Sequence, residues 1–184
     1  MEIELIDRRG TWRDVANAAR TTISQPPGEG KPSDEWIERI IKSEHSPLRL
    51  IEYRVKWFDI PSYVSTHIVR HKHGIESFVS TQREDRTGVD RSERSQTNPV
   101  NHEILINAQA ILNISKVRLC KQADKNTIKV WKLFLDEIVK KHDPILYKNC
   151  VPSCVYRGFC PEFKSCGYYE GKGKKVRGKY IKGE

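Results

Sequence analysis

The sequence predicts an α+β fold in which helices pack around a small antiparallel sheet. Residues 51–57 alternate apolar and charged side chains, which is typical of a strand with one buried face. Other stretches space their apolar residues by three and four positions, as amphipathic helices do. With 184 residues and no internal repeat, the chain has the length of one ordinary domain. Helices around one short sheet define the α+β class.

A strand and two helices are predicted ahead of this central strand. Residues 1–7 alternate apolar and polar side chains and predict a short strand. Thr11 is suited to cap the helix that follows. A loop rich in Pro and Gly separates this helix from a second one, which Ser33 or Asp34 is placed to cap. The residues of the second helix expected to face inward are Trp36, Ile40 and Ile41.

After the central strand, Asp59 and Pro61 are expected to open a third helix, because Pro is tolerated in a first turn. Four residues of this helix share one face: Val64, His67, Ile68 and His71. Residues 77–80 predict a short extended segment, and residues 81–98 predict a polar, Arg-rich loop.

Two longer helices are predicted in the second half of the chain. Residues 100–122 predict a helix of about six turns. Its apolar side would carry Ile104, Ala108, Ile111, and Ile114 or Ser115. Residues 126–141 predict another amphipathic helix, which Pro144 ends.

Charge favours an anionic partner. The chain carries 33 Lys and Arg against 24 Asp and Glu, a net charge of +9. This surplus does not separate nucleotides from polynucleotides or membrane surfaces. The N-terminus has charges where a signal peptide requires an apolar segment, and no apolar run approaches a membrane span in length. We therefore expect a cytoplasmic protein with no membrane partner and with five reduced Cys.

The densest polar cluster is Arg-His-Lys-His at residues 70–73, where the third helix gives way to a loop. Neighbouring cations repel one another unless an anion lies among them. A phosphate fits, since Arg offers a planar fork and Lys a point charge. A solvated helix C-terminus, where cations complement the helix dipole, accounts for the same residues equally well.

Two blocks of sequence resemble those of the flavin-dependent thymidylate synthases. The run RHKHGIESFVS at residues 70–80 is similar to the family signature of Arg-His-Arg, seven residues and Ser, with Lys72 in place of the second Arg. The run NAQAILNISKVR at residues 107–118 resembles the family's second block. AAR at residues 18–20 and HSP at residues 45–47 look like two further landmarks, so the similarity covers residues 18–144.

The resemblance implies an FAD enzyme that converts dUMP to dTMP. Methylenetetrahydrofolate, a folate, would donate the carbon, and NADPH would reduce the flavin. No Cys nucleophile is required in this family, so the protein's task is positioning and electrostatics. The family's sites lie between the subunits of a homotetramer. Since Asn113 and Arg118 are about 140° apart around a helix, one helix would feed different parts of a shared site.

The resemblance also assigns residues to roles. Arg118, beside the uracil, and Ser80 would be catalytic. The expected FAD-binding residues are Ser46, Arg70, His71, Lys72, Asn107, Ala108, Gln109 and Asn113. The expected nucleotide-binding residues are His67, Arg70, Ser80, Thr81, Gln82, Arg83, Arg91 and Arg118.

The sequence departs from the family mainly in the nucleotide half of this site. Members continue Ser-Gly-Arg-Tyr, whereas Gln82 stands here in the place of the phosphate-binding Arg and Arg83 comes one residue late. Arg91 or Arg94 would have to replace another phosphate-binding Arg. A different product, such as a hydroxymethylated pyrimidine nucleotide, is therefore the alternative to dTMP.

The division predicted for the chain is a synthase-like domain at residues 1–148 and a Cys-rich, basic segment at residues 149–184. Its thiols, Cys150, Cys154, Cys160 and Cys166, suggest zinc as a minor alternative, since no Cys-x-x-Cys knuckle is present. With zinc, the segment would read as a nucleic-acid-binding module; we instead expect no metal, no nucleic-acid partner and a solvated basic tail.

Overall fold

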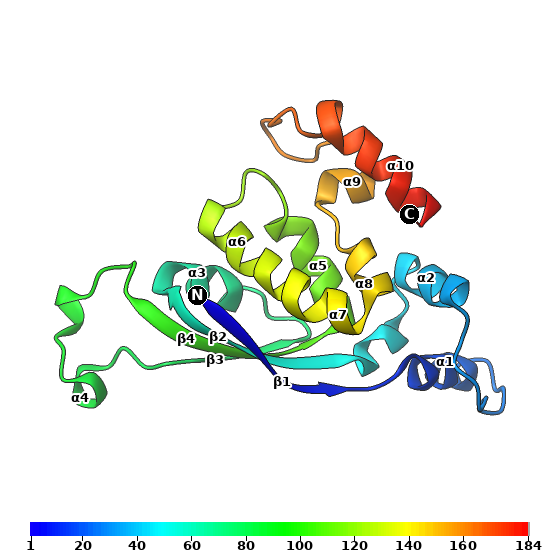
Figure 1. The fold of residues 1–184 in the computed structure, drawn as a ribbon, viewed down its shortest axis with the longest axis horizontal. Coiled ribbons are helices and arrows are strands. Elements are labelled where there is room, and N and C mark those ends of the chain that lie inside the picture. The colour runs from blue at the N-terminus through cyan, green and yellow to red at the C-terminus, as the bar shows by residue number, and fades with distance from the viewer. Residues whose placement is uncertain (184) are drawn as a thin grey trace.

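A computed structural model describes residues 1–183, and its architecture confirms the predicted α+β class (Figure 1). Four antiparallel strands form one sheet in the order β1-β2-β4-β3. Their bounds are β1 Glu2–Arg9, β2 Glu52–Pro61, β3 Ile75–Val79 and β4 Pro99–Asn107. Helices α3, α5, α6, α7 and α8 cover one face of the sheet in Figure 1, while α1 lies beyond one end of it.

Ten α-helices and four short helical segments make up the rest of residues 1–183 outside the loops. The α-helices are α1 Trp12–Thr21, α2 Asp34–Lys42, α3 Ser62–Val69, α4 Glu84–Thr87, α5 Ala108–Arg118, α6 Lys125–Phe134, α7 Lys140–His142, α8 Pro144–Asn149, α9 Ser153–Arg157 and α10 Lys174–Lys182. The short segments are η1 Ser46–Leu50, η2 Arg91–Glu93, η3 Leu135–Val139 and η4 Tyr169–Gly173.

Strand β2 is the centre of the core. Tyr53, Val55 and Trp57 are fully buried, as the period-two pattern predicted. The predicted caps also hold: Thr11 and Asp14 form a reciprocal capping box at the start of α1, and the Ser33 side chain accepts from the Trp36 backbone N–H of α2.

The predicted helix at residues 100–122 is wrong in its first third and in its last four residues, because α5 ends at Arg118. Residues 99–107 form β4, which pairs with β2 on one side and β3 on the other. Val100, His102, Ile104 and Ile106 are all buried, so this segment has a period of two that the helical spacing of Ile104 and Ala108 masked. Helix α5 begins only after Asn107, whose side chain accepts from the Ala110 backbone N–H at 2.9 Å.

The predicted helix at residues 126–141 is present, but it is built from α6, the π-helical turn η3 and α7. Pro144 does end it, and it also occupies the first turn of α8.

The basic tail does not remain a solvated coil. Segment η4 and helix α10 fold back on α9 and form a second, smaller hydrophobic cluster with it. Its buried members are Val151, Cys154, Val155 and Tyr169. Figure 1 shows α9 and α10 on the side of the helical layer away from the sheet. Within residues 1–183, no helix combines the length and apolar character that a membrane crossing requires.

Candidate functional site

The Arg-His-Lys-His cluster lies where α3 ends and the chain turns toward β3, alongside α5. A hollow of about 280 Å³ opens there. It is lined by Arg70, His71, Lys72, His73, Asn113 and Ile114. The two sequence blocks, separated by β3, a long loop and β4, therefore meet in space.

Arg118 ties the two blocks together. Its Nε donates to His71 Nε2 at 3.0 Å, and a terminal nitrogen donates to the His67 carbonyl oxygen at 2.5 Å. His71 Nε2 is thus an acceptor, which places the ring proton on Nδ1. Burial, and next the charge of Arg118, lower the pKa of His71 to about 4. His71 is therefore neutral at pH 7.

Two guanidinium groups lie near one another in this cluster. Burial and then the charge of Arg70 lower the pKa of Arg118 from its usual value. Arg70 is exposed and Arg118 is half-buried. Since His71 is neutral, it adds no charge to this pair, and an anion bound there would relieve the repulsion between the two arginines.

His67 is held by residues that the sequence analysis did not single out. Its Nδ1 lies 2.8 Å from Thr127 Oγ1. Thr127 Oγ1 in turn donates to Asp124 Oδ1 at 3.1 Å, and Asp124 caps α6. A capping Asp followed three residues later by Thr is a sequence signal for the cap, but nothing in it points to His67.

At the start of α5 the expected FAD-binding residues are partly engaged in the fold itself. The Asn107 amide caps the helix, and the buried Ala108 donates its backbone N–H to the Ile51 carbonyl at 2.9 Å. Gln109 Nε2 donates to Glu44 Oε2 at 3.2 Å. Gln109 Oε1 is buried and accepts no hydrogen bond within the described part of the chain. Exposed Ser46 begins η1, which packs against α5.

Lys116 is a further residue at this face that the motifs did not indicate. Its ammonium group bonds Glu44 and also donates to Asn113 Oδ1 at 3.3 Å. Because Lys116 follows Asn113 by three positions, the two side chains are neighbours on the helix surface. The sequence indicates that Lys116 and Asn113 are neighbours, but it does not indicate that Glu44 is the partner of Lys116.

The expected nucleotide residues are divided between the two ends of β3. His67, Arg70 and Arg118 lie at the Arg-His-Lys-His cluster, whereas the rest, Ser80, Thr81, Gln82, Arg83 and Arg91, follow the far end of the strand. Ser80 Oγ accepts from the Asn101 backbone N–H at 3.0 Å, and Ser80 N–H donates to the Asn101 carbonyl at 2.9 Å. The five residues of β3 separate Ser80 from the Arg-His-Lys-His cluster, roughly 17 Å at 3.3–3.4 Å per residue. One chain therefore leaves Ser80 and the loop after it apart from the Arg-His-Lys-His cluster.

The loop at residues 81–98 carries the remaining candidates. Exposed Thr81 precedes Arg83, which forms an ion pair with Asp85 at 2.9 Å. Gln82 Oε1 accepts from Arg94 at 2.7 Å. Arg94 is half-buried, and its Nε makes no hydrogen bond within residues 1–183. Arg91 is exposed in η2.

The four thiols proposed for zinc do not come together. Cys150 packs beside the main core and donates to the Leu146 carbonyl, whereas Cys154 and Cys160 belong to the C-terminal cluster. Across residues 1–183, no three His, Cys, Asp or Glu side chains are arranged to hold a metal ion.

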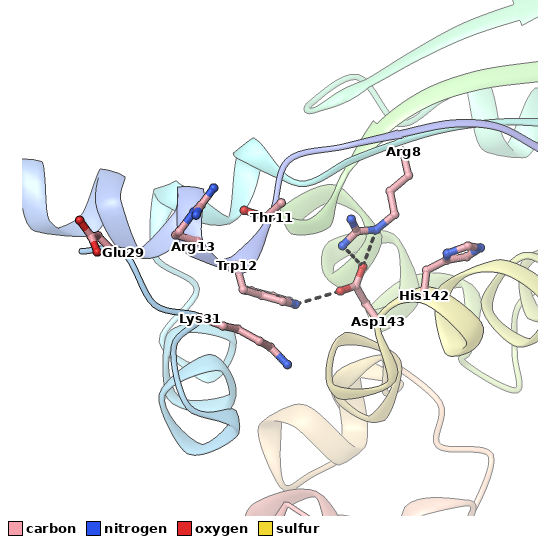
Figure 2. Close-up of a pocket in the computed structure, with 8 residues that line it drawn as sticks. All are labelled: Arg8, Thr11, Trp12, Arg13, Glu29, Lys31, His142 and Asp143. Carbon is pink, nitrogen blue, oxygen red and sulfur yellow. Dashed lines mark hydrogen bonds and ion pairs between the residues drawn. The ribbon is translucent and has the colours of Figure 1, made fainter. Parts of the chain in front are cut away.

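A larger cavity of about 440 Å³ lies away from all these residues, beside Asp143 (Figure 2). Asp143 is only 3% exposed and accepts from Arg8 at 2.7 and 3.0 Å and from Trp12 Nε1 at 2.9 Å. The Tyr53 hydroxyl also donates to it, and burial raises the pKa of Tyr53. With four donors, this carboxylate joins β1, α1 and β2 to the start of α8 as a structural link.

No family model and no curated protein matches the sequence. Solved structures do match. Flavin dependent thymidylate synthase ThyX from Helicobacter pylori, complexed with FAD and dUMP, is 15% identical with a TM-score of 0.65, over 82% of this chain and 100% of that chain. The UMP/dUMP methylase PolB from Streptomyces cacaoi, bound with 5-Br dUMP, is 12% identical with a TM-score of 0.63, over 86% of this chain and 95% of that chain.

These identities bear on the fold alone, and the fold that the sequence motifs implied is confirmed. This chain has the fold of the flavin-dependent thymidylate synthases.

Proposed function

We propose that this protein is an FAD-dependent thymidylate synthase that methylates dUMP to dTMP. One observation carries the proposal. Two motifs that lie apart in the sequence converge, with Arg118 of the second block bonded to His71 and to the His67 carbonyl of the first. A chance similarity in sequence has no reason to bring its matching residues into contact.

The residues present fit an FAD phosphate. Arg70 is exposed beside the hollow, and Lys72 and Asn113 line it with free approach from solvent. Two cations and an amide suit a pyrophosphate group, for which Arg provides bidentate hydrogen bonds. Further contacts to FAD would come from the start of α5, through Asn107, Ala108 and Gln109, and from η1, through Ser46.

The hollow is too small to enclose a dinucleotide. Its 280 Å³ is below the roughly 300–1,000 Å³ of pockets that enclose a ligand of drug size. Ser80 and the loop that follows it also lie at the opposite end of β3 from the hollow in one chain. Both facts support a homotetramer in which one subunit supplies the Arg-His-Lys-His cluster with Arg118 and its neighbour supplies Ser80 and that loop. A stable monomer in light scattering would contradict this assembly.

When bound and reduced by NADPH, the flavin supplies the hydride, while methylenetetrahydrofolate supplies the carbon. The chain's own residues bind and orient. Arg118 contacts the uracil and favours ionisation at its N3, because a guanidinium keeps its proton. Its bonds to His67 and His71 fix the direction of that charge. Ser80, with Thr81 and Gln82, contacts the nucleotide.

Arg94 is the arginine we assign to the nucleotide phosphate. Gln82, which stands in the family's arginine position, holds Arg94 at 2.7 Å. The Arg94 Nε is buried and has no hydrogen-bond acceptor within residues 1–183. A buried donor of this kind is normally paired, and a bound phosphate would provide the acceptor. Arg83 is already paired with Asp85, and Arg91 is exposed without such a tie to Gln82.

The same Gln82–Arg94 pair supports the second candidate, a related enzyme that modifies another pyrimidine nucleotide. A neighbouring fold belongs to a UMP/dUMP methylase, so substrate choice on this fold is not limited to dUMP. We assign the catalytic role to residues 1–148, treat residues 149–184 as an appended segment, and place the protein in the cytoplasm.

Absorbance and fluorescence titration with FAD test the proposal. The wild-type protein is expected to bind FAD, and Arg70→Ala with His71→Ala to abolish binding while circular dichroism stays unchanged. Arg39→Ala with His142→Ala, at exposed positions on α2 and α7, is the matched control and should bind as wild type. A wild-type protein that binds no FAD contradicts the proposed function.

A further inference from the structure

The C-terminal segment reaches the proposed FAD face through Tyr156 of α9. Helix α9 packs against α5. The Tyr156 ring lies under the Lys116 ammonium group, 3.9 Å from the nitrogen to the ring centroid. A cation this close to an aromatic face is attracted to it, and more strongly as the pair loses contact with water. Lys116 is only 18% exposed.

Tyr156 also contacts the partner of Lys116. Hydrogen bonding to Glu44 is the first cause that raises the pKa of the Tyr156 hydroxyl. Glu44 in turn pairs with Lys116 and accepts from Gln109 at 3.2 Å. Tyr156 thus covers the lysine of the ion pair that flanks two expected FAD-binding residues, Asn113 and Gln109.

The backbone of Tyr156 is held in place by α10. One Arg177 nitrogen on α10 donates to the Val155 carbonyl at 2.6 Å and to the Tyr156 carbonyl at 2.7 Å. Gly158, at φ +87°, ends α9, and a Cβ there would lie 2.9 Å from the Arg177 guanidinium. The folded tail therefore holds α9, and α9 holds Tyr156 against α5.

We propose that Tyr156 is a positioning residue for the FAD site. It acts through Lys116, which it keeps beside Asn113 so that the amide faces the cofactor. The inference rests on the proposed function, and it gives the appended C-terminal segment a role in cofactor binding. The tail thereby acts through side-chain contacts.

FAD titration of the full-length protein tests this role. Tyr156→Ala is expected to weaken FAD binding roughly threefold to thirtyfold, as loss of a shielded cation–ring contact implies. Tyr156→Phe keeps the ring over Lys116 and should recover most of the affinity. Tyr147→Ala is the matched control, because Tyr147 also bonds a carboxylate, Asp136, and also lies under a lysine, Lys140, on a surface away from the hollow.

Lys116→Met provides a second route if Tyr156→Ala folds poorly. It should weaken FAD binding to a similar extent, and the double variant should lose no more than either single one, since both act through the same contact. Wild-type affinity in both single variants, or an equal loss in Tyr147→Ala, overturns the inference while leaving the proposed function standing. Absence of FAD binding by the wild type overturns the proposed function and this role with it.

Discussion

The hollow beside residues 70–73 and the loop at residues 81–98 lie at opposite ends of β3, and the chain holds them differently. At the first end, Arg118 and Asn107 bond backbone or side-chain groups of neighbouring elements, and Ile75 and Ile114 are buried beneath. At the second end, no residue from 81 to 98 is buried. Its short elements are α4 and η2, and its ion pairs join exposed neighbours in the loop.

The comparison bears on the proposed roles of the two regions. A face built on the core is preorganised, which favours tight binding of a constant ligand. A loop with no buried side chain changes its sequence at little cost in stability. Two departures from the family pattern, at Gln82 and Arg83, fall in the loop, whereas Lys72, which replaces the second Arg of the signature, lies at the hollow. The following predictions test this contrast.

The largest effect is expected at Arg118. Arg118→Ala should reduce the free energy of dUMP binding by about 2–4 kcal/mol, because it removes one preorganised charge beside the uracil. In wild type, dUMP should perturb the flavin fluorescence and dCMP only weakly, since cytosine has no N3 proton to lose. Tighter binding of dCMP than of dUMP, or normal dUMP binding by Arg118→Ala, would move the assignment to the alternative product.

Replacing one glycine in each region by alanine compares how much a substitution there lowers the free energy of unfolding. Gly74 has φ +72°, and a Cβ there would lie 2.5 Å from the Asn107 amide that caps α5. Gly74→Ala should therefore lower the free energy of unfolding by roughly 2–3 kcal/mol, from backbone strain and loss of the cap. Gly88 in the loop has φ +67° and open space around it, so Gly88→Ala should cost about 1 kcal/mol. Urea unfolding measures both; equal losses would refute the contrast.

The smallest effect separates the arginines of the loop. Arg94→Ala should weaken dUMP binding by about 2 kcal/mol, the scale of a hydrogen bond to a charged group. Arg83→Ala, which removes a residue already paired with Asp85, should change it by less than about 0.5 kcal/mol. Each variant is titrated with dUMP and with deoxyuridine, which has no phosphate. A variant that has lost a phosphate contact binds dUMP more weakly than wild type but binds deoxyuridine as wild type does. The reverse order would make Arg83 the phosphate ligand.

Local patterns determined much of this protein. The alternation at residues 51–57 identified β2, and Thr11 and Ser33 marked the starts of α1 and α2, because period and capping depend on neighbouring residues alone. The spacing within the two motif blocks indicated the fold that the solved structures share. The roles of the individual site residues stay predictions until the titrations are made.

Tertiary structure decided the rest. Residues 100–106 fit a helix or a strand, and pairing with both β2 and β3 made them β4, because their alternate side chains then enter the core. The basic tail folds as η4 and α10 because Tyr169, Val176 and Tyr180 pack in one cluster with α9, a contact that no local spacing encodes. The links from Lys116 to Glu44 and Tyr156, and from His67 to Thr127, join residues far apart in the chain, so only the packed fold brings them together.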